Sequence, residues 1–83
     1  MSHNCGPVHY ARAQFNLGTM YDYGHGLPQD YVRAHMWYNL GGANGSENGT
    51  KNRDIVASHM SPTAIETAQR LALECMAKNY KGC

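Results

Sequence analysis

The sequence predicts an all-α domain of four helices, arranged as stacked α/α hairpins. Apolar and small residues recur at steps of three and four along most of the chain, which is the spacing of one helix face. No segment alternates polar and apolar residues at the period of two that a half-buried strand requires. Gly24, Gly26 and Pro28, and later Asn44-Gly45, fall between the helical stretches, where such residues are typical of turns.

The first helix is expected over residues 9–23. Its apolar stripe consists of Tyr10, Ala13, Leu17, Met20 and Tyr21. Gly24 follows at once and can end the helix in a left-handed conformation. Residues 24–30 contain two glycines and a proline, so they are expected to form a loop.

The second helix is expected over residues 29–43. Pro28 suits the entry to a helix because its φ is fixed and it has no N–H to leave unpaired. Asp30 places a negative charge at the positive end of the helix dipole. The apolar stripe consists of Tyr31, Ala34, Trp37, Tyr38 and Gly41.

The sequence signals for the third helix are weaker than those for the fourth. Ser46 can cap the third, but Gly49 weakens its first turns by about 1 kcal/mol relative to alanine. The helical spacing of this segment runs through Asn52, Ile55, Val56, His59 and Met60. Ser61 and Pro62 are a strong start signal for a fourth helix over residues 62–79. Its stripe consists of Ile65, Ala68, Leu71, Ala72, Cys75 and Met76.

The first half of the chain resembles the bacterial type of Sel1-like repeat, an α/α hairpin related to the tetratricopeptide repeat. The resemblance rests on Ala13-Gln14-Phe15-Asn16-Leu17-Gly18-Thr19-Met20-Tyr21, on Gly24-His25-Gly26-Leu27-Pro28-Gln29-Asp30-Tyr31, and on Ala34 with Trp37-Tyr38. We expect a tail over residues 1–8, the repeat over residues 9–45, and a degenerate second repeat over residues 46–83 that acts as a C-terminal cap.

This resemblance implies that the motif residues build the fold and take no part in catalysis. Gly18 is expected to let the second helix cross close to the first, and Gly24 and Gly26 to adopt positive φ. A cysteine-rich subclass of the family carries a disulfide in each repeat and is linked with β-lactam binding. The corresponding positions here are Gln14 and Gly42, so membership of that subclass is not expected.

Composition argues against two classes of partner. The net charge is +1 and charged residues make up 16% of the chain, which lacks the basic face of a nucleic-acid-binding protein. No apolar run approaches the roughly 20 residues of a membrane span. The N-terminus does not resemble a signal peptide, so a cytoplasmic location is expected unless a signal was removed.

Cysteine and histidine do not predict a metal or catalytic centre. Cys75 is expected to be a buried small hydrophobic residue, whereas Cys5 and Cys83 could form one bridge or an intermolecular bond; a reduced state is the default. His3, Cys5 and His9 lack zinc-ligand spacing, although Met1-Ser2-His3 could chelate Cu²⁺ or Ni²⁺. The remaining histidines, which are expected to be solvated or capping, are His25, His35 and His59. We expect no enzyme activity, metal or cofactor.

The leading functional hypothesis is an adaptor that binds a protein or peptide on a concave helical face. Its candidate contact residues are Gln14, Asn16, Thr19, Tyr23, Lys51 and Arg53. Any one of them could equally be an ordinary solvated residue. Two alternatives remain: a homodimer formed through the open end of the stack, and a fragment of a longer Sel1-like array.

Overall fold

The structure is a computed structural model that describes the backbone of residues 7–83 and the side chains from residue 10 onward. Its helices are α1 (Pro7–Tyr23), α2 (Tyr31–Ala43), α3 (Glu47–Ala57) and α4 (Pro62–Ala77). These residues include no strand. The predicted all-α helical repeat fold is therefore confirmed. Within residues 7–83, no helix is both long enough and apolar enough to cross a bilayer.

Four helix boundaries differ from the prediction. Helix α1 begins two residues earlier, at Pro7, and α4 ends two residues earlier, at Ala77. Helix α2 begins at Tyr31, because Asp30 is its N-cap and accepts hydrogen bonds from the backbone N–H groups of Val32 and Arg33 at 3.0 and 3.2 Å. Pro28 therefore lies in the loop and does not enter the helix. Helix α3 ends at Ala57, and residues 58–60 continue only as short turns whose N–H groups bond three residues back.

The capping predictions are confirmed. The Ser46 hydroxyl accepts from the N–H of Gly49, and the Ser61 hydroxyl accepts from the N–H of Ala64, both at 3.1 Å. Gly24 has a φ of 71°, the left-handed conformation expected at the end of α1. Side chains and one glycine thus end or begin each of these helices as the local sequence indicates.

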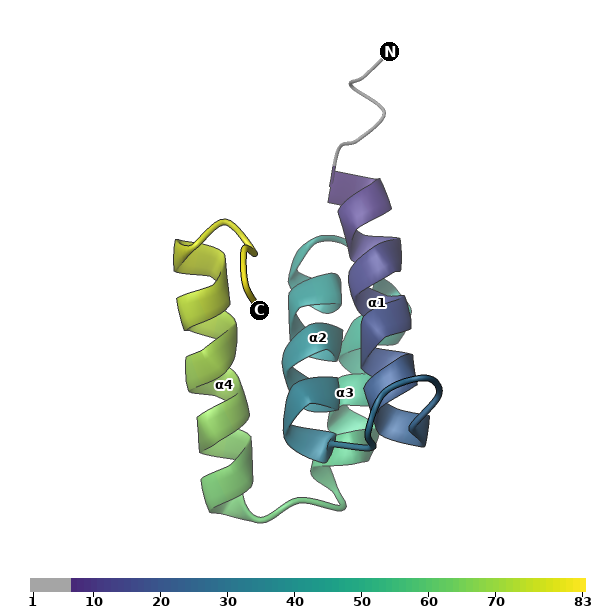
Figure 1. The fold of residues 1–83 in the computed structure, drawn as a ribbon, viewed down its shortest axis with the longest axis vertical. Helices are drawn as coiled ribbons and strands as arrows, with labels where there is room; N and C mark the ends of the chain where they lie inside the picture. Colours follow the sequence, from purple (N-terminus) through teal and green to yellow (C-terminus); the bar gives the residue numbers. More distant parts are fainter. Residues whose placement is uncertain (1–6) are drawn as a thin grey trace.

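Helix α2 lies at the centre of the molecule and packs against each of the other three helices (Figure 1). The chain reverses after α1, so that α1 and α2 form the expected antiparallel hairpin. The second half differs, because α3 and α4 each pack on α2 and contact each other little. The third and fourth helices therefore do not form the expected second hairpin, because each packs on α2 instead of on the other.

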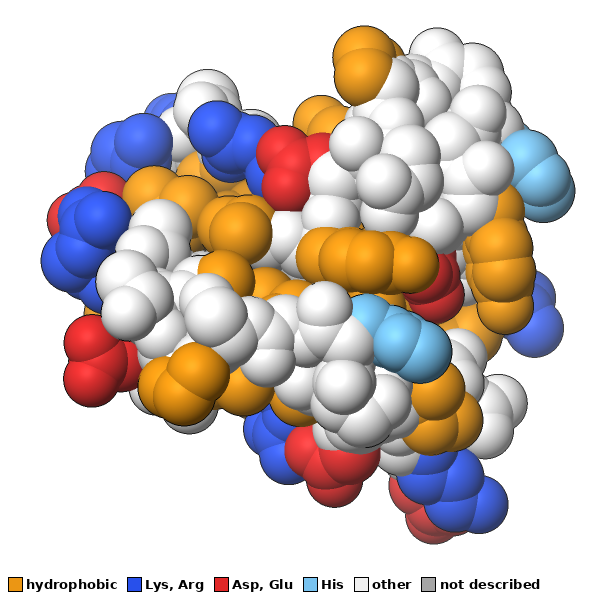
Figure 2. All heavy atoms as spheres, turned by 90° about the horizontal axis from the view of Figure 1, so that it is seen from below, with side chains coloured by type: hydrophobic (Ala, Val, Ile, Leu, Met, Phe, Trp, Pro, Cys, Tyr) orange, Lys and Arg blue, Asp and Glu red, His pale blue; other side chains and the backbone are white. Residues whose placement is uncertain are grey.

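Two apolar clusters hold these helices together. The first joins α2 to α4, and its buried members are Met36, Trp37, Leu40, Ala72 and Cys75. The second joins α2 to α3, and its buried members are Ala34, Tyr38 and Val56. Figure 2 shows the end of the molecule that carries the loops after α1 and α3. Hydrophobic side chains lie along a shallow groove across this end, and charged groups lie toward its edge. The core is thus thin and reaches the surface.

Several predicted core positions lie at the surface. Tyr10, Ile55 and Met76 have exposed fractions of 53%, 60% and 44%, and Ala13 and Tyr31 are also exposed. Conversely, His35 was expected to be solvated or capping but is only 2% exposed. The reason is the central place of α2, whose residues 34–38 are all buried, so that this helix has no polar face at that level.

The cysteines are arranged differently from the prediction. Cys75 is buried as expected, but it is not a free thiol, since it forms a disulfide with Cys83 across eight residues. The expectation that Cys83 would pair with Cys5 or with another molecule is therefore wrong. Cys5 and the possible chelating segment at residues 1–3 lie outside the described residues.

Close helix crossings depend on glycine. A Cβ atom at Gly18 would lie 2.6 Å from the Tyr38 ring, which confirms the expected crossing of α1 and α2. At Gly49 it would lie 2.7 Å from the carbonyl oxygen of Tyr38 and 2.8 Å from the nitrogen of Gly42. These are backbone atoms that cannot rotate away. Gly49 was expected to be a weak point of α3, yet it is what permits α3 to pack against α2.

We predict that Gly49→Ala destabilises the protein by about 1 to 3 kcal/mol, because overpacking against backbone outweighs the helix propensity that alanine adds. Urea unfolding followed by circular dichroism measures this change. Lys51→Ala on the exposed side of the same helix is the control and should change stability by less than about 0.5 kcal/mol. A Gly49→Ala variant as stable as the parent would contradict the packing of α3 on α2.

A second prediction concerns pH. Burial lowers the pKa of His35 below its ordinary value of 6.5, and nearby Arg53 lowers it further while Asp54 opposes the shift. The unfolded chain therefore binds a proton at His35 more readily than the folded chain does. The stability that neutral His35 provides is complete above the unfolded pKa and is lost as pH falls below about 6.5.

Unfolding in urea at several pH values between about 5 and 8 should show this loss, with His35→Gln flattening the curve across that window. Glutamine keeps a polar side chain of similar size but does not titrate. If the parent and His35→Gln show the same pH dependence, the buried neutral state of His35 is wrong.

Candidate functional site

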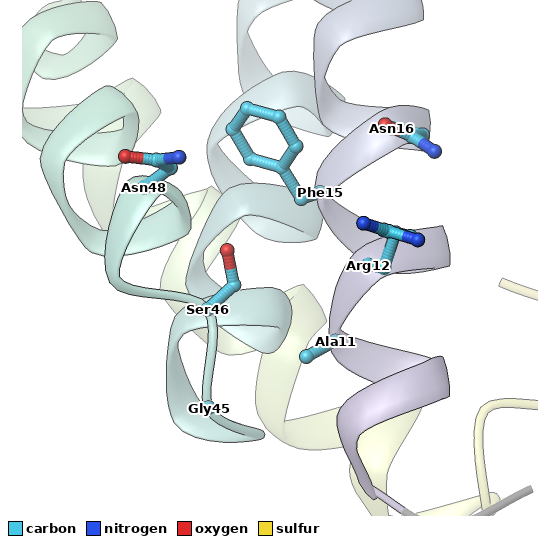
Figure 3. A pocket seen from close by; sticks show the side chains of 7 residues that line it. All are labelled: Ala11, Arg12, Phe15, Asn16, Gly45, Ser46 and Asn48. Carbon is cyan, nitrogen blue, oxygen red and sulfur yellow. The ribbon is translucent and has the colours of Figure 1, made fainter. Parts of the chain in front are cut away.

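A surface hollow lies between α1 and the turn that leads into α3. It has a volume of about 380 Å³ and is lined by Ala11, Arg12, Phe15, Asn16, Gly45, Ser46 and Asn48 (Figure 3). We call this the α1–α3 groove. One wall is a face of α1, and the other is a tight turn with the first residues of α3. Hydrogen-bonded backbone therefore holds both walls in place.

The turn that forms the second wall is fixed by its sequence. Gly45 has a φ of 121°, which strongly favours glycine, and Ser46 follows as the N-cap of α3. The N–H of Ser46 donates to the carbonyl of Gly41 at 2.8 Å, which folds the turn back onto the end of α2. This hydrogen bonding holds Ser46 and Asn48 opposite α1.

The wall contributed by α1 presents mixed chemistry. Arg12 and Asn16 are one helical turn apart and both are exposed. Phe15 is half-buried, and its ring projects from α1 toward the side on which Asn48 lies (Figure 3). The ring is also 5.6 Å from the ring of Tyr38, measured between centroids, so its position is held by the core. The groove therefore has an apolar floor and a polar rim.

A hydrogen-bond chain supports the turn from behind. The Asn44 side-chain amide donates to Gln14 Oε1 at 2.8 Å and to the Tyr80 hydroxyl oxygen at 3.2 Å. Gln14 is only 3% exposed. Its side chain therefore tethers the turn to α1, and this placement does not agree with the expectation that Gln14 is a partner contact.

A second, shallower hollow flanks the other side of the same turn. Its volume is about 450 Å³, and it shares Gly45 and Ser46 with the α1–α3 groove. Exposed Lys51 and Glu47 contribute a cation and an anion to its lining. Of the predicted contact residues, the structure thus places Asn16 in the groove and Lys51 beside it.

The other predicted contact residues lie elsewhere. Thr19 is half-buried and donates to the carbonyl of Phe15 at 3.2 Å. Tyr23 is 65% exposed but lies at the far end of α1, where its ring stacks on His25. Arg53 donates to Asn39 Oδ1 at 2.9 Å and pairs with Asp54 at 3.0 Å. These three side chains do not line the groove.

Sequence reasoning missed Arg12, Phe15 and Asn48 as groove residues. Arg12 and Asn16 share an i, i+4 spacing that indicates a common face, so that signal was available. Asn48 could not be found in the same way, because only the fold of the turn brings it opposite α1. Phe15 belongs to no regular apolar stripe of the first helix.

One polar core group has a raised pKa. Burial raises the pKa of the Tyr38 phenol to about 12, and the neighbouring Asp22 carboxylate adds to this, while the Thr19 hydroxyl opposes it. The phenol donates to Asp22 Oδ2 at 2.9 Å. A neutral phenol that donates to a carboxylate ties α2 to α1.

No group of three or more metal-ligating side chains occurs among the residues that the structure describes. The comparison with known families gave one match: residues 11–46 match the Sel1 repeat. None of the curated proteins and none of the solved structures matches the chain.

The matched segment includes the α1–α2 hairpin from Ala11 and the turn that forms the second wall of the groove. Sel1 repeats generally mediate protein–protein interactions, and the family is generally non-catalytic. The chain thus contains one recognisable Sel1-like repeat, at residues 11–46.

Proposed function

We propose that this protein is a non-catalytic interaction module that binds a peptide segment of a protein partner in the α1–α3 groove. The observation that carries the proposal is the half-buried Phe15 ring, which lies between exposed amide side chains on the two walls, Asn16 and Asn48. An apolar floor with a few convergent polar groups is typical of a ligand site. The general role of Sel1 repeats in protein–protein interaction supports it.

The chemistry of the lining defines the kind of peptide that fits. Phe15 and the adjoining backbone offer contact area to one apolar side chain. The amides of Asn16 and Asn48 can donate and accept, which suits the alternating N–H and C=O groups of an extended backbone. Arg12 is exposed on the rim and can form a bidentate pair with a carboxylate. The preferred ligand is a short segment with an apolar anchor and a nearby acidic group.

The second hollow extends this surface around the turn. A segment that leaves the α1–α3 groove past Ser46 meets Lys51, which provides another site for a partner carboxylate. Tyr23 and Arg53 are not included in the proposed surface, because the first is remote and the second is engaged by Asn39 and Asp54. The proposed contacts are thus Arg12, Phe15, Asn16, Asn48 and Lys51.

The homodimer alternative receives less support. Binding of a second copy at the open end of the stack requires an apolar face on α1. The exposed residues of α1 from residue 10 onward are mixed in character: Tyr10, Arg12, Ala13, Asn16 and Tyr23. Charged Arg12 and polar Asn16 interrupt this face, which is therefore less apolar than the interface of an obligate dimer.

A displayed library of random peptides, selected on the folded protein, tests the proposal. Selected peptides should share an apolar residue and an acidic residue, and ¹⁵N-labelled protein should show shift changes clustered around the groove. Asn16→Ala and Asn48→Ala should each weaken binding about fivefold, which corresponds to a lost hydrogen bond worth about 1 kcal/mol. Isothermal titration calorimetry measures these affinities.

Gln69→Ala is the matched control, because it removes an exposed amide from α4. It should leave peptide affinity unchanged. Selection of no binding peptide, or binding that Gln69→Ala weakens as much as Asn16→Ala does, would contradict the proposed site.

A further inference from the structure

The chain beyond α4 turns back and covers part of the core. Helix α4 ends at Ala77, and the N–H of Tyr80 donates to the carbonyl of Cys75 at 2.8 Å, which reverses the chain. Figure 1 shows this segment, in yellow, turning from the end of α4 toward α2. We call residues 78–83 the C-terminal flap. Tyr80 and Cys83 of the flap pack against the apolar cluster that contains Trp37 and Leu40.

Noncovalent contacts hold the flap at Tyr80. Its hydroxyl oxygen accepts from the Asn44 amide at 3.2 Å, and its ring stacks on Tyr10 with centroids 6.1 Å apart. Tyr10 is itself 53% exposed, so this stack lies at the surface. These contacts stabilise the closed flap only modestly, since each is at least partly open to water.

Two features oppose closure. Asn79 and Tyr80 have φ values of 55° and 64°, the left-handed region that disfavours residues with a Cβ atom. The indole N–H of Trp37 is buried without an acceptor among the described residues. An unsatisfied buried donor is costly, and water that enters the cluster when the flap opens can accept from it. These two costs offset part of the stabilisation that the noncovalent contacts of Tyr80 provide.

The disulfide links the C-terminal flap covalently to α4. Cys75 is 1% exposed on α4, whereas Cys83 is half-buried at the end of the flap segment. Both cysteines line a surface hollow of about 150 Å³, together with Arg33, Glu74 and Lys78. A small thiol can reach the bond through this hollow. Cations beside it favour the approach of a thiolate.

We propose that Cys75–Cys83 is a site of reversible thiol–disulfide exchange that latches the C-terminal flap over the Trp37 cluster. Reduction by a dithiol opens the flap. A thiolate of the reductant attacks Cys83 Sγ, the more accessible sulfur, and the bond to Cys75 breaks. Cys75 leaves as a thiolate and takes a proton. The second thiol of the reductant then attacks the mixed disulfide and frees Cys83.

This exchange transfers two electrons and two protons from the dithiol to the protein, and the dithiol becomes a disulfide. A disulfide oxidant such as oxidised glutathione reverses the reaction and closes the flap. The occupant of the covered face is thus a segment of the chain itself, held when the bond is formed and released when it is reduced.

Trp37 is the only tryptophan of the chain, so its fluorescence reports on the cluster alone. The experiment uses the full chain with Cys5→Ser, which leaves only the two bonded cysteines. Dithiothreitol should shift Trp37 emission to longer wavelength and raise its quenching by acrylamide by at least about twofold, as local opening admits water and solute. Oxidised glutathione should restore both values. Emission intensity is not used, because a disulfide itself quenches tryptophan.

Far-UV circular dichroism and thiol titration accompany each measurement. The proposal requires two free thiols after reduction together with unchanged helix content. Cys83→Ser should match the reduced protein and give no response to dithiothreitol. Tyr80→Phe, which keeps the disulfide, should retain the response.

Two outcomes would overturn the latch. If two thiols appear while emission and quenching stay the same, the flap remains docked without its covalent link. If helix content collapses on reduction and in Cys83→Ser, the disulfide supports the whole fold, and no separate opening of the flap exists.

Discussion

The enclosure of α2 by the other three helices is the constraint on which the rest of the structure depends. Residues 34–38 of α2 are buried in succession, although a helix in a small domain usually keeps one face in water. Such enclosure requires short distances between helix axes, which Ala34 and the glycines at the crossings provide. It also carries polar groups inward: His35 is held neutral by burial, and the Trp37 indole is left without an acceptor in the described part of the chain.

Local signals in the sequence account for most of the fold. Ser46, Ser61 and Gly24 act on groups within five residues of themselves, so their roles can be inferred without knowing the tertiary structure. The Sel1-like motif extends this to the α1–α2 hairpin, since its glycine pattern specifies both the loop and the helix crossing. The expected boundaries therefore lie within a few residues of the observed ones.

Positions determined by distant contacts could not be predicted in this way. Gln14 lies next to the expected apolar stripe, and only its bond to Asn44, thirty residues away, shows that it is a tether. His35 appears polar and solvated until α3 and α4 are placed on opposite sides of α2. The Cys75–Cys83 bridge requires the chain to reverse through two left-handed residues that are not glycine, which no sequence pattern indicates. In the α1–α3 groove, only the wall formed by α1 could be inferred from the sequence. The other wall exists only once the turn is folded.

The groove and the flap meet at one side chain. The two protons of the Asn44 amide are donated to Gln14 on α1 and to Tyr80 on the flap. Asn44 also directly precedes Gly45 and Ser46, which form a wall of the groove. Opening the flap removes one of the two acceptors of that amide and leaves the Asn44 side chain bonded to Gln14 alone, while backbone hydrogen bonds still hold the turn on α2. Coupling between two equilibria is reciprocal, so a shift of the turn on opening of the flap would make a ligand of the groove favour one state of the flap. These two hydrogen bonds of Asn44 thus connect the proposed peptide surface with the proposed latch at Cys75 and Cys83.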